Sequence, residues 1–283
     1  ILIWPFFAFI VVLTAILYPI SGSWQWGGGW LSEMGFSDFA GSTIVHSVGG
    51  WAALVGALIL GARNGKFGKD GTTNVMPGSS IPMATLGVWI LWLGWFGFNG
   101  ASQLALGTYG DANAVATIFA NTCMAAAGGV IAPMILSRLM DGKTDIGSTL
   151  NGAIAGLVSI TAEPLTPTIG EAIIIGGVGG IICMFGMKLL DKLKIDDVVG
   201  AIPAHLFAGI WGTLIVPFTN PDTSYGIQII GILAFGVFTV IGSTIVWMLL
   251  KSTVGIRATV EDEEYGLDHT ESGQIGLEYV SKK

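Results

Sequence analysis

Eight long apolar blocks divide the sequence, and most of them approach the roughly 20 residues that an α-helix needs to cross a membrane. They lie at about 1–19, 41–61, 81–102, 113–137, 148–162, 168–190, 198–218 and 225–251. Charged residues make up only 11% of the chain and the mean hydropathy is +0.72, whereas a soluble domain carries about 25% charged residues. Strands of a β-barrel alternate over about 10 residues instead. The sequence therefore predicts an all-α polytopic membrane protein.

Lysine and arginine occur only after every second block. They are Arg63, Lys66, Lys69, Arg138, Lys143, Lys188, Lys192, Lys194, Lys251, Arg257, Lys282 and Lys283. The loops on the other side, at 20–40, 103–112, 163–167 and 219–224, contain neither residue type. Because short basic loops stay in the cytoplasm, we expect a multi-pass protein of the cell membrane with both ends of this chain, including the C-terminus, on the cytoplasmic side.

Two parts of different composition follow from this pattern. Residues 1–254 form the predicted transmembrane domain, and residues 255–283 form an acidic cytoplasmic tail. The acidic side chains of the tail are Glu261, Asp262, Glu263, Glu264, Asp268, Glu271 and Glu278, and they supply much of the net charge of −7. We expect His269 in this tail to be exposed, because no metal-ligand spacing surrounds it.

Glycine is about twice as frequent as usual, at 43 of 283 residues. The stretches "AAAGGVIA" (125–132) and "GGVGG" (176–180) predict faces on which helices approach closely. Since these glycines fall inside predicted helices with no strand before them, they indicate no nucleotide-binding loop. Cys123 and Cys183 lie in different blocks without CxxC spacing, so we expect buried, inert thiols.

Two segments share the pattern D-x-x-G-x-x-x-x-H-x-x-x-G. The first holds Asp38, Gly41, His46 and Gly50, and the second holds Asp197, Gly200, His205 and Gly209. The first segment enters the membrane from the outside and the second from the inside, so the repeat is inverted. Inverted repeats are typical of transporters, whose sites lie at the repeat interface near the membrane midplane. We predict that the two histidines meet there, one ring nitrogen donating and one accepting.

The repeat also predicts how many helices a complete chain would contain. The second segment would end the second half of a complete repeat, so the first should end a half of five helices, of which two are present here. The chain begins with Ile1 and has no basic stretch or cleavage site before its first block, which does not read as a signal peptide. We therefore expect this chain to lack about three N-terminal helices.

With these residues in view, the sequence resembles the Amt branch of the ammonium transporter family (Amt/MEP/Rh) over essentially its whole length. The resemblance rests on "WGGGWL" (26–31), "DFAGSTIVHSVGGWAALVGA" (38–57), "LGWFGFNGAS" (93–102), "NGAIAGLVSITA" (151–162), "DDVVGAIPAH" (196–205) and "GIRATVEDEEYGLDHTESG" (255–273). It implies the inverted-repeat fold of eleven helices, of which this chain would carry about eight, helices four to eleven. It also implies a homotrimer with one pore per subunit, and a tail that contacts neighbouring subunits and a P-II signalling protein.

The resemblance also implies a recruitment site and a gate. Trp26 and Ser102 would bind ammonium at the outer mouth, where an indole face attracts a cation and a hydroxyl accepts an N–H bond. Phe98 would be one of two stacked rings that gate the pore. Taken alone, Trp26 could equally be an interfacial aromatic residue and Phe98 a core or lipid-facing one.

By the same resemblance, His46 and His205 would line the pore. Asp38 would support recruitment near the outer mouth, and Asp197 would be its counterpart near the inner mouth. Each carboxylate could instead cap the helix that follows it, and both roles can hold together.

Two positions depart from the family pattern. Pro203 lies two residues before the second histidine, which leaves the local helix geometry there open. Glu163, in "AEPLTPT" (162–168), has no counterpart in the matched motifs, and we expect it to be a solvated loop carboxylate.

A function follows from these expectations. A bare cation is very costly in an apolar pore, whereas ammonia is small and only modestly polar. We therefore predict transmembrane transport in which ammonium is recruited, loses its proton near Phe98, and passes the two histidines as ammonia. Whether the proton follows stays open.

Two other functions would use parts of the same pattern. An ammonium sensor with the same fold is one alternative. A metalloenzyme built on the two histidines is a poor one, because a third close ligand is missing. We expect no enzyme activity, no cofactor, no metal and no nucleic-acid partner.

Overall fold

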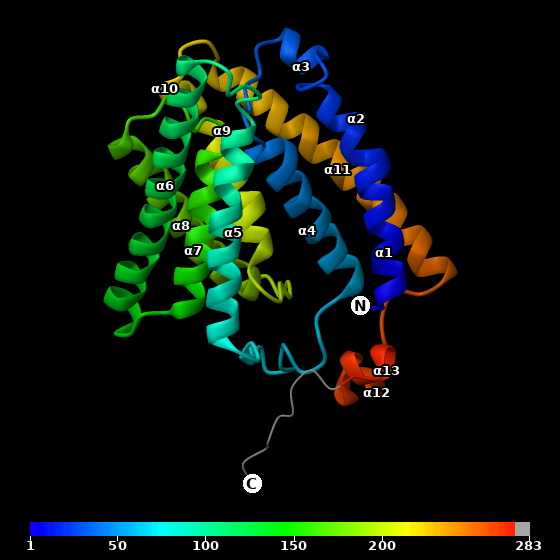
Figure 1. Cartoon of the computed structure of the whole chain (residues 1–283). Helices are drawn as coiled ribbons and strands as arrows, with labels where there is room; N and C mark the ends of the chain where they lie inside the picture. The colour runs from blue at the N-terminus through cyan, green and yellow to red at the C-terminus, as the bar shows by residue number, and fades with distance from the viewer. Residues whose placement is uncertain (275–283) are drawn as a thin grey trace.

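The computed structural model describes residues 1–274, and nearly all of their regular structure is helical (Figure 1). Seven helices are long and apolar enough to cross a membrane, namely Ile3–Ser23, Ser42–Leu60, Ile81–Ala101, Tyr109–Asp141, Ile169–Lys192, Ile202–Thr219 and Tyr225–Thr253. An eighth apolar helix, Ile146–Ile160, is shorter. Within residues 1–274, the only β pairing is one isolated bridge between Phe67 and Thr73. The predicted all-α class is confirmed, with one helix for each of the eight apolar blocks.

Several of these spans are composed of shorter elements. In chain order the elements are α1 (Ile3–Val12), η1 (Leu13–Leu17), α2 (Tyr18–Ser23), α3 (Trp30–Glu33), η2 (Ser42–Ser47), α4 (Val48–Leu60), α5 (Ile81–Ala101), α6 (Tyr109–Asp141), α7 (Ile146–Ile160), α8 (Ile169–Lys192), η3 (Ile202–Phe207), α9 (Ala208–Leu214), α10 (Val216–Thr219), α11 (Tyr225–Thr253), α12 (Val260–Tyr265) and α13 (Leu267–Ser272). The η elements are π-helical turns. Such turns are rare and occur frequently at functional sites.

Helices α6, α7 and α8 form a tightly packed group. A Cβ built on Gly176 of α8 would lie 2.0 Å from the carbonyl oxygen of Ala125 in α6, and one on Gly129 would lie 2.2 Å from that of Gly152 in α7. Only glycine permits such backbone contact, which confirms the predicted close-packing faces. Of the two thiols, Cys183 is buried and Cys123 is partly buried, and both are free.

Helix α7 is the shortest of the eight apolar spans. Its 15 residues extend about 22 Å, less than the roughly 30 Å hydrocarbon core of a bilayer. Every side chain from Gly152 to Ile160 is buried against other helices. Because protein rather than lipid surrounds α7, its length does not have to match the membrane.

A second group contains α1, α4 and α11, which lie together in Figure 1 on the opposite side from α6–α8. Trp51 of α4 lies against Gly236 of α11, and Trp247 of α11 lies against Gly56 of α4. Phe9 of α1 stacks on Trp247 at a ring-centroid distance of 4.1 Å. This reciprocal packing fixes α4, which carries one half of the repeat.

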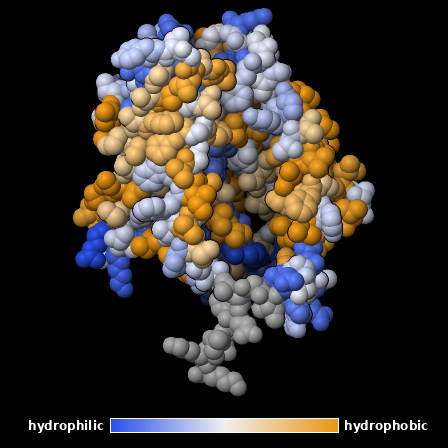
Figure 2. Space-filling model, viewed as in Figure 1, coloured by the Kyte–Doolittle hydropathy of each residue, from blue (hydrophilic) through white to orange (hydrophobic). Residues whose placement is uncertain are grey.

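One end of the bundle carries the basic loops. All four ion pairs found within residues 1–274 lie there: Arg63–Asp196, Lys66–Asp191, Lys188–Asp141 and Arg257–Glu263. Figure 1 places the N-terminus and the short helices α12 and α13 at this same end. Figure 2 shows orange apolar side chains over the flanks and blue polar ones gathered at the two ends, as a membrane-spanning bundle requires.

The first part of the acidic tail folds back onto this end. Arg257 donates to the backbone oxygens of Leu60 and Ala62 and pairs with Glu263. His269 is exposed, as predicted, with its ring edge against Tyr265. The tail residues Glu278, Lys282 and Lys283 lie outside the described residues.

Candidate functional site

Asp38 caps the π-helical element η2. Its Oδ1 accepts from the backbone N–H groups of Gly41 and Ser42, and its Oδ2 accepts from those of Thr43 and Ile44, at 2.8–2.9 Å. Gly41 turns the chain with φ 113°, a conformation that favours glycine. Burial raises the pKa of the Asp38 carboxyl to about 6, and the four N–H bonds act in the opposite direction. The fully buried carboxylate thus organises the entry into the His46 segment.

Asp197 caps the start of η3 in the way that Asp38 caps η2. It accepts from the N–H groups of Gly200, Ala201 and Ile202 at 3.0, 3.1 and 2.7 Å. Gly200 has φ 77°, like its counterpart in the first segment. Unlike Asp38, Asp197 is only half-buried. The sequence left capping and action on the ion both open, and the structure assigns both carboxylates at least the capping role.

The two segments cross with matching contacts, as an inverted repeat requires. A Cβ on Gly50 would lie 2.6 Å from the Cβ of Leu206, and one on the equivalent Gly209 would lie 2.5 Å from the Oγ of Ser47. Ser47 and Leu206 are themselves equivalent positions of the repeat. The absence of side chains at the two glycines lets the helices cross close enough for their histidines to meet.

The two histidines meet at this crossing. The Nδ1 atoms of His46 and His205 are 3.2 Å apart, with ring centroids at 5.3 Å and an interplanar angle of 29°. One Nδ1 must therefore donate and the other accept. His46 is buried and its Nε2 has no hydrogen-bond partner, whereas His205 is partly exposed. The pair leaves unused ring nitrogens for a small polar molecule.

Aromatic rings of α5 cover His46. Trp95 stacks on His46 at a centroid distance of 4.9 Å and 20°, and its Nε1 donates to the Oγ1 of Thr161 at 2.9 Å. Phe98 lies at a ring-centroid distance of 5.3 Å from His46 and is 38% exposed. Sequence reasoning identified Phe98 and missed Trp95. Trp95 precedes Phe98 by three residues, which places the two rings on one face of α5. This spacing could have identified Trp95 from the sequence.

The two predicted recruitment residues bond to different parts of the site. Trp26 is 47% exposed and donates its Nε1 to the carbonyl oxygen of Asp38 at 3.0 Å. Ser102, at the end of α5, donates its hydroxyl to the carbonyl oxygen of Phe98 at 2.8 Å, leaving its lone pairs free to accept. In the described chain no hydrogen bond or ring contact joins Trp26 to Ser102 directly.

Pro203 fits the first turn of η3, where a missing N–H leaves no partner unsatisfied. The equivalent η2 is also π-helical without a proline. The π-helical geometry is therefore a property of both halves of the repeat and not a distortion caused by Pro203.

The prediction that Glu163 is solvated is wrong. Glu163 is 8% exposed, and its Oε2 accepts from the Nδ2 of Asn220 at 2.7 Å. Its Oε1 accepts a weaker bond from the N–H of Thr166 at 3.4 Å. The loop folds inward because the buried Asn121 donates to the carbonyl oxygens of two of its prolines. No local sequence pattern indicates these hydrogen bonds, because Asn121 and Asn220 are distant from the loop in sequence.

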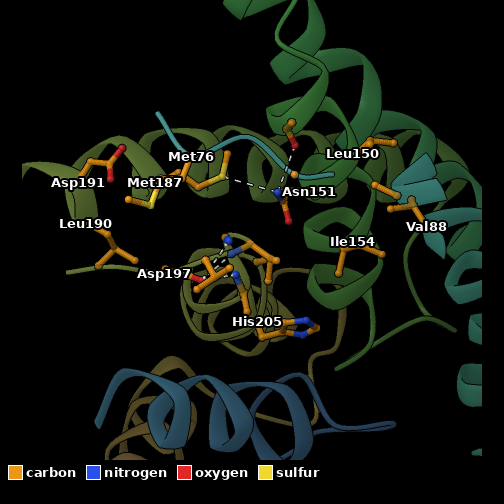
Figure 3. Close-up of a pocket in the computed structure, with 18 of the residues that line it drawn as sticks. Met76, Val88, Leu150, Asn151, Ile154, Met187, Leu190, Asp191, Asp197 and His205 are labelled. Atoms are coloured by element: carbon orange, nitrogen blue, oxygen red, sulfur yellow. Dashed lines mark hydrogen bonds between the residues drawn. The ribbon is translucent and has the colours of Figure 1, made fainter. Parts of the chain in front are cut away.

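Two cavities lined by His205 lie on the basic side of the histidines. The larger, of about 590 Å³, is shown in Figure 3, where Asn151 and Met187 lie near Asp197 and His205. The smaller, of about 270 Å³, has both histidines in its wall together with small residues of α4. His205 lines both cavities and His46 lines the smaller one, so the pair borders these cavities on the basic side. Sequence reasoning missed Asn151 and Met187.

The fold is a bundle of apolar helices, and an inverted repeat brings two polar rings together within it. These features place the chain in the class of polytopic membrane proteins built from inverted repeats. The sequence model of the Ammonium Transporter Family matches residues 1–276, and the chain belongs to this family.

The chain is similar to curated proteins of this family. It is 39% identical over 302 aligned positions to the ammonium transporter Amt2 of Archaeoglobus fulgidus, covering 95% of this chain and 63% of that protein. It is 42% identical over 267 positions to a putative ammonium transporter of Synechocystis sp., covering 93% and 60%. The chain thus spans about three-fifths of the length of these relatives.

Solved structures agree. A structure titled a sensor Amt protein superposes with a TM-score of 0.86 at 36% identity, covering 92% of this chain and 68% of that one. Candida albicans Mep2 superposes with a TM-score of 0.81 at 28% identity, covering 92% and 61%.

Proposed function

We propose that this protein transports ammonium nitrogen across the cell membrane by conducting ammonia past His46 and His205. The observation that carries the proposal is the 3.2 Å contact between the two rings at the crossing of the inverted repeat. Two neutral imidazoles offer a neutral polar molecule hydrogen-bond partners without offering a cation a counter-charge. Curated relatives at 39% and 42% identity are named ammonium transporters, which supports the same substrate here.

Recruitment takes place at the opposite end from the basic loops. Trp26 presents a partly exposed indole face, and Ser102 presents hydroxyl lone pairs. Ammonium binds between such groups by cation–π attraction of about 0.5–2 kcal/mol and by hydrogen bonds. At Phe98 it then gives its proton to water of the outer mouth, because the two neutral imidazoles beyond this ring offer no counter-charge that would offset the lost hydration of a cation. Asp38 sets the outer potential, and Asp197 acts at the inner mouth.

The basic end faces the cytoplasm in this proposal, because all the lysines and arginines of the chain fall on that side. The acidic tail is then cytoplasmic. The apolar flanks in Figure 2 supply surface for lipid and for two further subunits of a homotrimer. The tail, docked through Arg257, is where a P-II signalling protein would act.

Uptake of labelled ammonium into lipid vesicles containing the complete gene product tests the proposal. We expect saturable uptake. Trp26→Leu keeps the bulk and removes the π face, so the half-saturating concentration should rise about 2- to 30-fold, which corresponds to the cation–π contribution. Vesicles that take up no more ammonium than empty ones would refute transport.

A sensor is the second candidate, favoured by the similarity to the solved sensor Amt protein. A sensor would bind ammonium at the same recruitment site and change tail conformation without net flux. Saturable binding with uptake no faster than that of empty vesicles, together with altered protease access to the tail, would select this function.

A further inference from the structure

A second buried carboxylate lies at the outer end of the bundle, and none of the roles above uses it. We propose that Glu163 is a positioning residue for recruitment: its negative charge draws ammonium to the outer mouth. This inference rests on the proposed transport function. It starts from three observations on Glu163: its position, its burial and its missing counter-ion.

The position follows from a continuous set of hydrogen bonds. The N–H of Phe39 donates to the carbonyl oxygen of Ala162 at 2.8 Å. Phe39 directly follows Asp38, and Glu163 directly follows Ala162, so the two acidic residues lie next to the same backbone hydrogen bond. The backbone carbonyl oxygen of Asp38 in turn accepts the indole N–H of Trp26. Backbone pairing thus connects the loop that carries Glu163 to the segment that holds Trp26 of the proposed recruitment site.

The same backbone pairing leads to the histidines. The N–H of Ala40 donates to the carbonyl oxygen of Thr161, whose side chain holds the indole of Trp95 at 2.9 Å. Trp95 stacks on His46. Glu163 thus stands at the outer end of the wall that continues to the pore pair.

The carboxylate is short of partners. An ionised carboxylate accepts about four hydrogen bonds, and Glu163 receives one at 2.7 Å from Asn220 and a weak one at 3.4 Å from Thr166. It is 92% buried, since its exposed fraction is 8%. A buried charge is costly unless it is paired.

No fixed cation supplies the pairing. The four ion pairs within residues 1–274 all lie at the basic end, and the outer loops of the sequence contain no lysine or arginine. Glu163 therefore has no positively charged partner among the described residues of the protein, and a recruited ammonium ion would supply one. A mobile ammonium ion near the outer mouth is therefore stabilised by Glu163 without direct contact.

The size of the effect follows from Coulomb's law. If the separation is taken as roughly 10 Å, with an effective dielectric constant between about 20 and 80, one unit charge changes the binding of a monovalent cation about 2- to 15-fold. The rate at saturating ammonium should change little, because the charge acts on binding and not on the passage of ammonia past the histidines.

A purely structural role for Glu163 makes a different prediction. Its bond to Asn220 ties the loop at 161–168 to the end of α10, and loss of this tie would lower stability and activity together. Glu163→Gln removes the charge, and its amide oxygen still accepts from Asn220. Asn220→Ala removes the tie and keeps the charge. Glu33→Gln is the matched control, since Glu33 is an exposed acid at the same end.

The test is the concentration dependence of ammonium uptake by the complete gene product in lipid vesicles, at about 0.02 M and 0.5 M salt. We expect Glu163→Gln to raise the half-saturating concentration about 2- to 15-fold at low salt, and less at high salt because screening is stronger there. Glu163→Asp should restore most of the difference, and Glu33→Gln should change it by less than about 1.5-fold.

The outcomes separate the two proposals. Failure of the wild-type protein to take up ammonium would refute the proposed function before any variant is compared. With an active wild type, an unchanged half-saturating concentration in Glu163→Gln would overturn the role of Glu163. A loss of maximal rate and melting temperature shared by Glu163→Gln and Asn220→Ala would overturn it too, and would show a structural tie instead.

Discussion

Replacement of the two capping aspartates should have unequal effects on stability, although the two residues are equivalent in the repeat. Asp38→Ala leaves four backbone N–H groups without their acceptor, in a site that is fully buried. Asp197→Ala removes a comparable cap, but Val198 and Val199 beside it are exposed. Water can therefore replace the lost acceptor at Asp197 and cannot do so at Asp38.

The magnitudes follow from this difference. A buried donor without a partner costs about 1–3 kcal/mol, so two or more dry N–H groups make Asp38→Ala cost about 3–6 kcal/mol. The wetter Asp197→Ala should cost about 0.5–2 kcal/mol, as an ordinary helix cap does. At roughly 2–4 °C per kcal/mol, the melting temperature should fall by about 6–24 °C for the first variant and about 1–8 °C for the second.

The assay is thermal unfolding of the purified protein in detergent, followed by tryptophan fluorescence at one fixed scan rate, because unfolding of membrane proteins is often irreversible. Asp38→Asn, which keeps one acceptor oxygen, should fall between wild type and Asp38→Ala. Equal shifts for the two alanine variants, or a larger shift for Asp197→Ala, would refute the reasoning from burial.

Three further predictions concern packing, the tail and the histidine pair. Gly176→Ala places a Cβ 2.0 Å from a backbone oxygen and should lower the melting temperature by several degrees, whereas Gly170→Ala in the same helix, with nothing within 4 Å, should not lower it. Arg257→Ala should speed proteolysis after residue 255 several-fold relative to Lys192→Ala, an exposed control, because three acceptors lose their donor. His46→Leu and His205→Leu should be non-additive in the free energy of unfolding by about 0.5–3 kcal/mol, and strict additivity would mean that the rings do not interact.

Much of this fold could be predicted from local patterns. Apolar blocks of about 20 residues have few stable alternatives in a membrane, so the helices and the side of the basic loops follow from composition. The contact between His46 and His205 followed from the inverted repeat, because symmetry relates positions far apart in sequence.

Other features depend on contacts that the sequence does not encode locally. The shortness of α7 reflects its burial among other helices. Glu163 is buried because Asn121 and Asn220, distant in sequence, hold its loop. Trp95 looked like one tryptophan among ten, and only its stacking on His46 distinguishes it.

The central claim is that ammonia crosses the membrane past the two histidines, and it is tested most directly by ammonium uptake into vesicles with wild type, His205→Leu and His205→Glu. We predict saturable uptake by the wild type and a clear change in rate with Leu, because one polar wall of the path is lost. The Glu variant should be less impaired, because a protonated carboxyl can still donate to His46. Equal uptake by wild type and His205→Leu, at matched amounts of folded protein, would contradict the account.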